Sequence, residues 1–266
     1  NRVGDFNYNV SLTGTYTKRK WLHYIDAANT PDWLKLTGKE VGAQVGFISA
    51  GLFQSQEEID NSPTIVGKAV RVGDIKYVDR NGDGVISYEQ DRGYVGAAAY
   101  PKFVGGLSFS GDWKGIDFSM NWAGAAGFKI NWYQSGENSS ITWFGYGMGK
   151  DVAYDHYFYD PENPNDPRTN LTSANPRLTM DKAAQVSVSG QHILHNGNYL
   201  KLKNLTVGYT LPKDWVQKVC MQNVRVYVSG ENLLTITKFK GIDPEMMSGV
   251  GYAPMRQYAF GVNVTF

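Results

Sequence analysis

One stretch of the chain has the residue types and spacing of a calcium-binding loop. It reads DRNGDGVI and runs from residue 79 to residue 86. Side chains that carry oxygen atoms stand at loop positions 1, 3 and 5, namely Asp79, Asn81 and Asp83. Gly84 follows at position 6, where such loops turn sharply, and Val85 at position 7 would offer its backbone carbonyl oxygen. Oxygen ligands at alternate positions converge on one point only when the chain wraps around it, so this spacing favours calcium.

Position 12 of this loop departs from the calcium pattern, because it holds Gln90 in place of a bidentate carboxylate. Glu89 and Asp91 flank Gln90 on either side. The alternative structure is a metal-free turn, in which the Asp and Asn side chains accept hydrogen bonds from their own backbone. If calcium binds, we expect it to stiffen the loop and to take no part in catalysis.

A second group of residues could bind a ligand by stacking. Residues 129–196 contain aromatics, glycines and prolines without a sustained period, and a connection of that length is usually functional or disordered. Five aromatic side chains there offer flat apolar faces: Trp132, Tyr133, Trp143, Phe144 and Tyr146. We expect them to stack on sugar rings or to pack on a partner. The alternative is that they pack this loop against itself or lie at a membrane interface.

The remaining residues with reactive side chains do not indicate an enzyme. Four histidines lack the context of a metal site or a catalytic triad: His23, His156, His192 and His195. The glycines of GYGMGK at residues 145–150 follow no predicted strand and open no helix, so a phosphate-binding loop is not expected. Cys220 is the single cysteine, which excludes an internal disulfide.

The composition is compatible with a transmembrane β-barrel, in which apolar residues alternate with polar ones along each strand. The chain has 266 residues, a net charge of +1, 14% aromatic residues and a mean hydropathy of −0.38. The balanced charge gives no reason to expect a nucleic-acid partner. No run of 18 apolar residues predicts a transmembrane helix. Transmembrane β-barrels, in contrast, have a mean hydropathy similar to that of soluble proteins.

The last ten residues carry the clearest period-two pattern in the chain. One face of this segment, Gln257–Phe266, is apolar or aromatic: Tyr258, Phe260, Val262, Val264 and Phe266. Its length suits a tilted strand that crosses a bilayer. The edge strand of a soluble sandwich is the alternative, but such strands normally carry a protective charge or proline, which this segment lacks.

Similar alternation recurs upstream. A hairpin is predicted over Lys102–Phe128, with its tight turn at Lys114-Gly115. In Asn198–Leu211 the apolar phase slips from even to odd positions, which a β-bulge at Lys203-Asn204 would explain. Further strands are expected in Asp5–Tyr16, in the segment that begins at Val224, and more weakly in Trp33–Leu36 and Val41–Phe47.

These strands predict an all-β fold, an antiparallel transmembrane β-barrel of the outer membrane with long extracellular loops. If Phe266 lies at the periplasmic rim, the connections outside the cell are residues 51–101, 129–196 and 237–256. The periplasmic connections are then residues 114–115 and 211–223. This arrangement needs one more descending strand within residues 18–40 if Asp5–Tyr16 ascends.

Several motifs resemble those of the SusC/RagA family of TonB-dependent transporters. They include GDIKYVDRNGDGVIS, YPKFVGGLSFSGDWKGIDFSMNWAGAAG and NYLKLKNLTVGYTLP. The matching segments lie in the family's order and cover nearly the whole chain: residues 52–60, 73–87, 100–127, 159–168, 198–212 and 224–245.

The resemblance implies a 22-stranded barrel around an amino-terminal plug, with a SusD-like lipoprotein on the outside. Residues 1–266 would form the carboxy-terminal part of that barrel, roughly eight to ten strands, without the plug through which TonB acts. The implied function is import of oligosaccharides or peptides across the Gram-negative outer membrane. The alternatives are a stand-alone barrel acting as an adhesin or enzyme, and a secreted calcium-dependent β-sandwich that binds glycans.

The resemblance also implies two residue roles. The family often places an Asp-Arg pair after the calcium-like loop, and this sequence has Asp91-Arg92 there, so Asp91 would complete the metal site. The aromatic terminal residue Phe266 and the apolar face of the last strand would be the signal that the outer-membrane insertion machinery reads.

Overall fold

The computed structural model describes residues 1–97, 100–131, 153–179, 194–246 and 252–266. Its main element is an antiparallel sheet of seven strands in the order β1-β2-β9-β10-β13-β14-β15. The strands are β1 (Arg2–Val3), β2 (Phe6–Tyr16), β9 (Phe103–Trp113), β10 (Ile116–Ala126), β13 (Tyr199–Thr210), β14 (Asn223–Thr237) and β15 (Gln257–Thr265). The described residues thus form fewer wall strands than the eight to ten expected. None of the described helices is long and apolar enough to cross a membrane.

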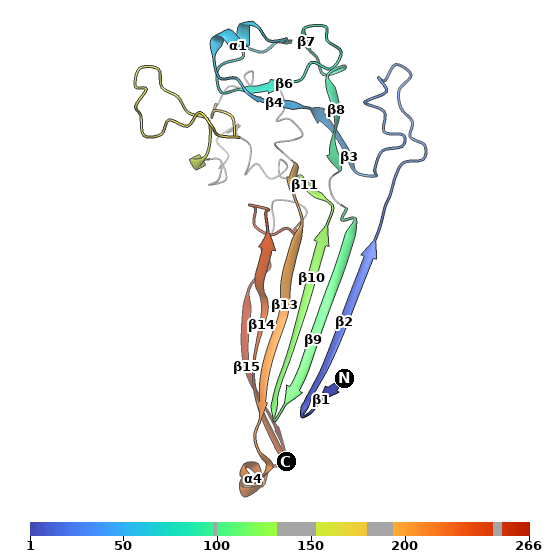
Figure 1. Cartoon of the computed structure of the whole chain (residues 1–266), viewed down its shortest axis with the longest axis vertical. Coiled ribbons are helices and arrows are strands. Elements are labelled where there is room, and N and C mark those ends of the chain that lie inside the picture. Colours follow the sequence, from blue (N-terminus) through green and yellow to red (C-terminus); the bar gives the residue numbers. More distant parts are fainter. Residues whose placement is uncertain (98–99, 132–152, 180–193, 247–251) are drawn as a thin grey trace.

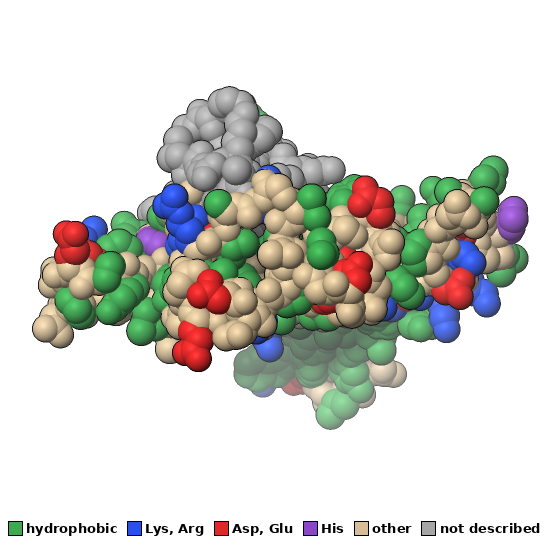
Figure 2. Space-filling model, turned by 90° about the horizontal axis from the view of Figure 1, so that it is seen from above, with side chains coloured by type: hydrophobic (Ala, Val, Ile, Leu, Met, Phe, Trp, Pro, Cys, Tyr) green, Lys and Arg blue, Asp and Glu red, His purple; other side chains and the backbone are tan. Residues whose placement is uncertain are grey.

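The long strands stand side by side, and most other elements gather at one end of them (Figure 1). We call this end the loop end; its described residues are 17–97, 100–102, 127–131, 153–179, 194–198, 238–246 and 252–256. The opposite end, called the turn end, carries the β9–β10 turn, α4 (Lys213–Val216) and η3 (Gln217–Val219). Seen from above, the loop end presents acidic and basic side chains interspersed among polar and apolar ones (Figure 2).

The pairing register keeps apolar and polar side chains on opposite faces of the sheet. Directly paired residues on successive strands form an almost wholly apolar row: Val10, Phe109, Met120, Leu205, Gly230 and Tyr258. The next row, on the other face, is polar on each of the six long strands: Ser11, Ser108, Asn121, Asn204, Glu231 and Gln257. A slip of one residue would exchange the two faces, so this pattern specifies the register.

The predicted hairpin turn is confirmed at Lys114-Gly115. Both residues have positive φ, 48° and 88°, as a two-residue turn between twisted strands requires. The backbone N–H of Thr210 on β13 donates to the carbonyl oxygen of Gly115 at 2.7 Å, so the turn is also joined to the neighbouring strand. The predicted bulge is confirmed as well, because pairing of β13 with both neighbours shifts register at Lys203.

The prediction of a hidden wall strand in residues 18–40 was wrong. β2 pairs directly with β9, so the whole stretch between them is one excursion from the described sheet. Residues 33–36 lie in a turn region, where the Asp26 carboxylate accepts the backbone N–H of Leu36 at 2.9 Å. A side chain that bonds nearby backbone in this way competes with strand pairing. The strand expected at 41–47 exists as β3 (Ala43–Phe47), but it pairs with β8 (Arg92–Ala97) outside the main sheet.

Residues 43–97 form a small body of their own at the loop end. Besides β3 and β8, it contains β4 (Ser49–Leu52), α1 (Gln56–Asp60), β5 (Thr64–Ile65), β6 (Ile75–Tyr77) and β7 (Val85–Ile86). Its apolar core consists of Phe47, Leu52, Ile65, Ile75, Tyr77, Ile86 and one residue from a distant segment, Tyr157. The short strands β11 (Lys129–Asn131) and β12 (Leu194–Asn196) pair between this body and the sheet.

Replacing Gly115 by alanine in the complete protein should destabilise the sheet by about 1–2 kcal/mol, because an L side chain is strained at this positive φ. The new Cβ would also lie 2.9 Å from the carbonyl oxygen of Thr210. Urea unfolding in detergent followed by tryptophan fluorescence measures the change. The matched control is Gly14→Ala, whose Cβ meets only the Phe103 ring at ordinary contact distance. Equal midpoints for the two variants would contradict the prediction.

Candidate functional site

The loop with calcium-like spacing is closed by hydrogen bonds from its own backbone. The Asp79 carboxylate accepts the N–H groups of Gly82 at 2.7 Å and Gly84 at 2.8 Å. Asp83 accepts the N–H of Val85 at 2.8 Å, and the Asn81 side-chain oxygen accepts the N–H of Asp83 at 3.1 Å. These are the hydrogen bonds of the metal-free alternative, and they engage the side-chain oxygens of all three residues within one turn.

Asp91 lies at the base of this loop and is fully buried. One carboxylate oxygen accepts the N–H of Arg80 at 2.9 Å, and the other accepts the N–H of Ser87 at 2.7 Å. The hydrogen bond from Gly84 is the main cause that lowers the pKa of the Asp79 carboxyl; burial opposes it, and contacts with Gly82, Asp83 and Asp91 add to the lowering. The structure therefore brings Asp79 and Asp91 together across the loop.

The donor chemistry of the loop is compatible with calcium. Each carboxylate oxygen that accepts one N–H bond keeps a second lone pair for a hard cation. Across the described ranges, no group of three or more His, Cys, Asp or Glu side chains is already arranged as a metal site. Metal binding through Asp79, Asn81, Asp83, Val85 and Asp91 therefore stays a prediction.

A second feature of the loop end, which was not predicted, is the docking of residues 153–178 on the small body. Tyr157 is 4% exposed and fills the core beside Gly73, where a Cβ atom would approach its ring to 2.4 Å. The Arg177 guanidinium pairs with the Asp74 carboxylate at 2.7 Å, and the Arg177 N–H donates to Gly73 O at 2.9 Å. Burial raises the pKa of Asp74, whereas the Arg71 N–H and the Arg177 guanidinium oppose this rise.

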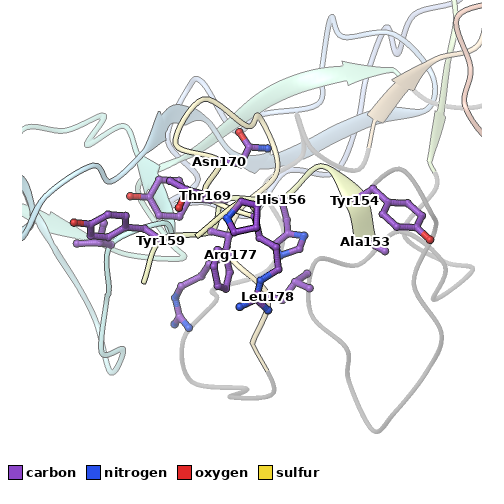
Figure 3. A pocket seen from close by; sticks show the side chains of 13 residues that line it. Ala153, Tyr154, His156, Tyr159, Thr169, Asn170, Arg177 and Leu178 are labelled. Carbon is purple, nitrogen blue, oxygen red and sulfur yellow. The ribbon is translucent and has the colours of Figure 1, made fainter. Parts of the chain in front are cut away.

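The docked segment lines a cavity of about 1040 Å³. In close view, Tyr159 lies to one side of it and Tyr154 to the other, with His156, Thr169 and Arg177 between them (Figure 3). The wall also includes Phe158, whose ring lies 4.6 Å from the Arg168 guanidinium carbon. In the sequence, only the aromatic and proline content of the connection 129–196 indicated a functional segment, and this content does not show where in the connection the cavity lies.

The Arg168 guanidinium is held in place by Asp166. Its Nε donates to one Asp166 oxygen at 3.0 Å and its Nη2 to the other at 2.8 Å, a bidentate pair. The Arg168 side chain, together with its backbone N–H, holds the pKa of the Asp166 carboxyl down to about 2. The pair thus fixes a planar cation over the Phe158 ring at the rim of the cavity.

Two other groups of residues were predicted to be functional, namely the loop aromatics and the apolar face of the last strand. The loop aromatics Trp132, Tyr133, Trp143, Phe144 and Tyr146 lie outside the described residues, so their role stays a prediction. The apolar side chains of the last strand all project from one face of β15 and are exposed: Tyr258, Phe260, Val262, Val264 and, just beyond it, Phe266. Their role as an assembly signal likewise stays a prediction.

Comparison with known proteins places this geometry in context. No family model matches the chain. TonB-dependent receptor P26 of Formosa agariphila is 29% identical over 300 residues, which cover 100% of this chain and 28% of that protein. TonB-dependent receptor SusC of Bacteroides thetaiotaomicron is 25% identical over 79% of this chain and 18% of its own length. A solved structure of the RagAB peptide transporter superimposes with a TM-score of 0.64 at 21% identity, covering 100% of this chain and 28% of that one.

The chain is similar to SusC/RagA-type TonB-dependent receptors over its whole length. This confirms the resemblance inferred from the motifs, and the likeness to RagAB confirms the antiparallel all-β fold class. TonB-dependent receptor P3 of Formosa agariphila, 27% identical over 86% of this chain, matches through 22% of its length. The chain therefore spans less than a third of the relatives that it matches.

Replacing Asp166 by asparagine should release Arg168 and speed trypsin cleavage at the Arg168–Thr169 bond severalfold. The Asp166 pKa lies below its ordinary value of 3.8, so its stabilising contribution is present above about pH 4 and is lost as pH falls through about 2. Mass spectrometry of timed digests at neutral pH measures the cleavage rate. Asp160→Asn is the control, because Asp160 accepts the Glu162 N–H and acts on Arg168 only through a charge interaction weaker than that of Asp166. An unchanged rate in the Asp166 variant would contradict this role.

Proposed function

We propose that the chain is the carboxy-terminal part of the barrel wall of a SusC-type TonB-dependent transporter in a Gram-negative outer membrane. The observation that carries this proposal is the apolar face of the seven-stranded sheet. Leu12 and Phe260, on the two outer long strands, are 80% and 81% exposed, and Val207 and Val228, on interior strands that are paired on both sides, are 46% and 45% exposed. Soluble proteins rarely expose an apolar surface of this extent, whereas a lipid bilayer would cover it.

The polar face of the sheet supports the same assignment. It carries Ser, Thr, Asn and Asp side chains, which suit the interior of a large barrel, where water or a plug would contact them. An open sheet cannot remain in lipid with unpaired edges, so the remaining wall strands must pair with β2 and β15. In this orientation the loop end lies outside the cell and the turn end faces the periplasm, as long outer and short inner connections indicate.

The proposed transport is energised import of oligosaccharides or peptides, together with a SusD-like surface lipoprotein. The relatives by name are receptors and transporters: one is SusC, and RagAB is named a peptide importer. TonB would act through a plug, which we assign to the rest of the complete receptor. An adhesin on a stand-alone barrel is the competing function, and it would need no energy from TonB.

The deciding experiment is growth of a strain that lacks the complete gene. We expect loss of growth on one glycan or peptide source from a broad panel, with normal growth on glucose. A strain without TonB should show the same loss, because import through a plugged barrel requires TonB. Growth that is unaffected on every source, or a defect only in surface attachment, would favour the adhesin.

We further propose that the loop from Asp79 to Asp91 binds calcium in the external medium. The side chains of Asp79, Asn81 and Asp83 all accept backbone N–H groups within one turn, and the buried Asp91 interacts with Asp79. These groups, with the Val85 carbonyl, would hold the ion and stiffen the small body. Calcium sites of extracellular modules are weak, which fits the absence of a bidentate carboxylate at position 12.

Terbium luminescence can test the calcium site in the complete receptor. The Trp33 indole N–H donates to the Gln90 carbonyl oxygen at 3.0 Å, so Trp33 is placed to sensitise an ion bound in the loop. We expect saturable terbium emission that millimolar calcium displaces and that the double variant Asp79→Asn/Asp83→Asn loses. Trp33→Phe should dim the emission without changing the calcium concentration needed for displacement, and Asp60→Asn on α1 is the control. Equal emission from wild type and the double variant would end the proposal.

A further inference from the structure

Three consecutive basic residues follow the loop end of β2. They are Lys18, Arg19 and Lys20, and all three are exposed. None of them takes part in an ion pair among the described residues. The proposed import function gives these charges no role.

Hydrogen bonds fix the backbone of this basic segment and bring two more lysines beside it. The Trp21 N–H donates to the Lys39 carbonyl oxygen at 2.9 Å, which closes the stem of the excursion that stands beside β2 in Figure 1. The Thr17 N–H donates to the Lys102 carbonyl oxygen at 2.7 Å, which joins this stem to the start of β9. Five basic residues therefore meet here, and we call them the basic rim: Lys18, Arg19, Lys20, Lys39 and Lys102.

The basic rim keeps most of its positive charge. Glu40 forms a β-bridge with Lys20, and its carboxylate pairs with the Lys102 ammonium at 2.5 Å. Farther out in the excursion, Asp32 pairs with Lys35 at 2.6 Å. Five basic side chains thus face one acidic side chain in the described stem, so an anionic partner would be attracted to it.

Two tyrosine rings orient cations of the rim without neutralising them. The Arg19 guanidinium carbon lies 4.6 Å from the centre of the Tyr100 ring, and the Lys39 Nζ lies 5.7 Å from that of Tyr94. A ring face attracts a cation but accepts none of its charge. The Arg19 side chain forms no hydrogen bond with the described residues, so its planar set of donors stays available.

The basic rim begins where the apolar face of the sheet ends. Leu12 is 80% exposed, and Tyr16, the last residue of β2, is 69% exposed. The ten steps from Phe6 to Tyr16 extend about 33 Å, or about 25 Å along the barrel axis at a tilt of about 40°. Lipid-facing bands of outer-membrane barrels have this height, so the rim lies level with the head groups of the outer leaflet. The half-exposed Trp21 suits the same interface.

We propose that the basic rim binds the phosphate group of an anionic glycolipid of the lipid A type in the outer leaflet. This assignment rests on the proposed place of the sheet in an outer membrane and adds a lipid ligand to it. A phosphate group offers several acceptor oxygens, which match the donors of arginine and lysine. A soluble anion would meet the same charges. The acyl chains of a lipid would also cover Leu12 and Tyr16 directly below the rim.

Native mass spectrometry of the complete receptor in a neutral detergent tests the site. The probe is lipid A with one phosphate group, and the comparison probes are the same glycolipid without phosphate, inorganic phosphate and a sulfated oligosaccharide. We expect a saturable adduct with the phosphorylated lipid. The dephosphorylated lipid should bind at least tenfold more weakly, and millimolar inorganic phosphate should not displace the adduct.

The decisive variant is Lys18→Gln/Arg19→Gln/Lys20→Gln. It should weaken binding of the phosphorylated lipid roughly ten- to hundredfold, because each basic residue beside an anionic surface contributes about fivefold. The three side chains are exposed and the backbone N–H groups remain, so an unchanged urea midpoint should show that the variant folds. Lys18→Arg/Lys20→Arg keeps the charges and should retain affinity. Lys213→Gln/Lys218→Gln, at the turn end, is the matched control and should bind like wild type.

Each outcome bears on the lipid site separately from the import function. Equal affinity of the triple glutamine variant and wild type would overturn the site, and so would equal binding of the dephosphorylated lipid. Displacement by inorganic phosphate, or tighter binding of the sulfated oligosaccharide, would assign the rim to soluble anions and overturn the lipid ligand. Failure of the import function would instead appear as normal growth of the deletion strain on every source, with the lipid adduct intact.

Discussion

The strict alternation of side chains across a paired sheet is the constraint on which the rest of this structure depends. In the row from Val10 to Tyr258 each strand contributes an apolar residue or a glycine, and in the adjacent row each contributes a polar one. Because the side-chain period is two, the register of every strand is tied to that of its neighbours. In the proposed barrel, one face of this sheet would contact lipid and the other a polar interior, so a slip in register would place side chains of the wrong kind on both faces.

The bulge at Lys203 shows how the sheet accommodates an exception to this rule. It returns Leu205 to the apolar face after Leu202, while Lys201 and Lys203 stay on the polar face. Both lysines then reach Glu245 in the connection after β14, with Nζ to carboxylate distances of 2.9 Å. Lys201, which is 1% exposed, also pairs with Asp243 at 2.6 Å. A local irregularity in one strand therefore ties a loop to the wall, and removing both acidic partners of the buried Lys201 would leave its charge uncompensated.

Residue patterns predicted the wall much better than the loop end. β15, the β9–β10 hairpin and the bulge in β13 were all predictable, because each is encoded by neighbouring residues with a period of two or by a Lys-Gly turn. The alternation at 41–47 also predicted a strand correctly, but periodicity does not say which sheet a strand joins. Counting it in the wall made a further strand in residues 18–40 necessary, and the direct pairing of β2 with β9 removes that need.

The cavity could not be predicted because it depends on contacts between residues far apart in the sequence. Arg177 and Asp74 are separated by 103 positions, and the residues beside them in the sequence do not indicate that they form an ion pair. In the sequence, Tyr157 cannot be told apart from the other aromatic residues of the loop. In the structure it lies in the core beside Gly73, which has no Cβ and so leaves room for the Tyr157 ring. These contacts give a long connection the stability that local propensity does not provide. A pocket with fixed polar groups needs such a support, since donors on an unanchored loop would lose their orientation and with it their selectivity. The buried tyrosine and the ion pair, which both line the cavity, therefore determine whether this part of the chain can recognise a ligand.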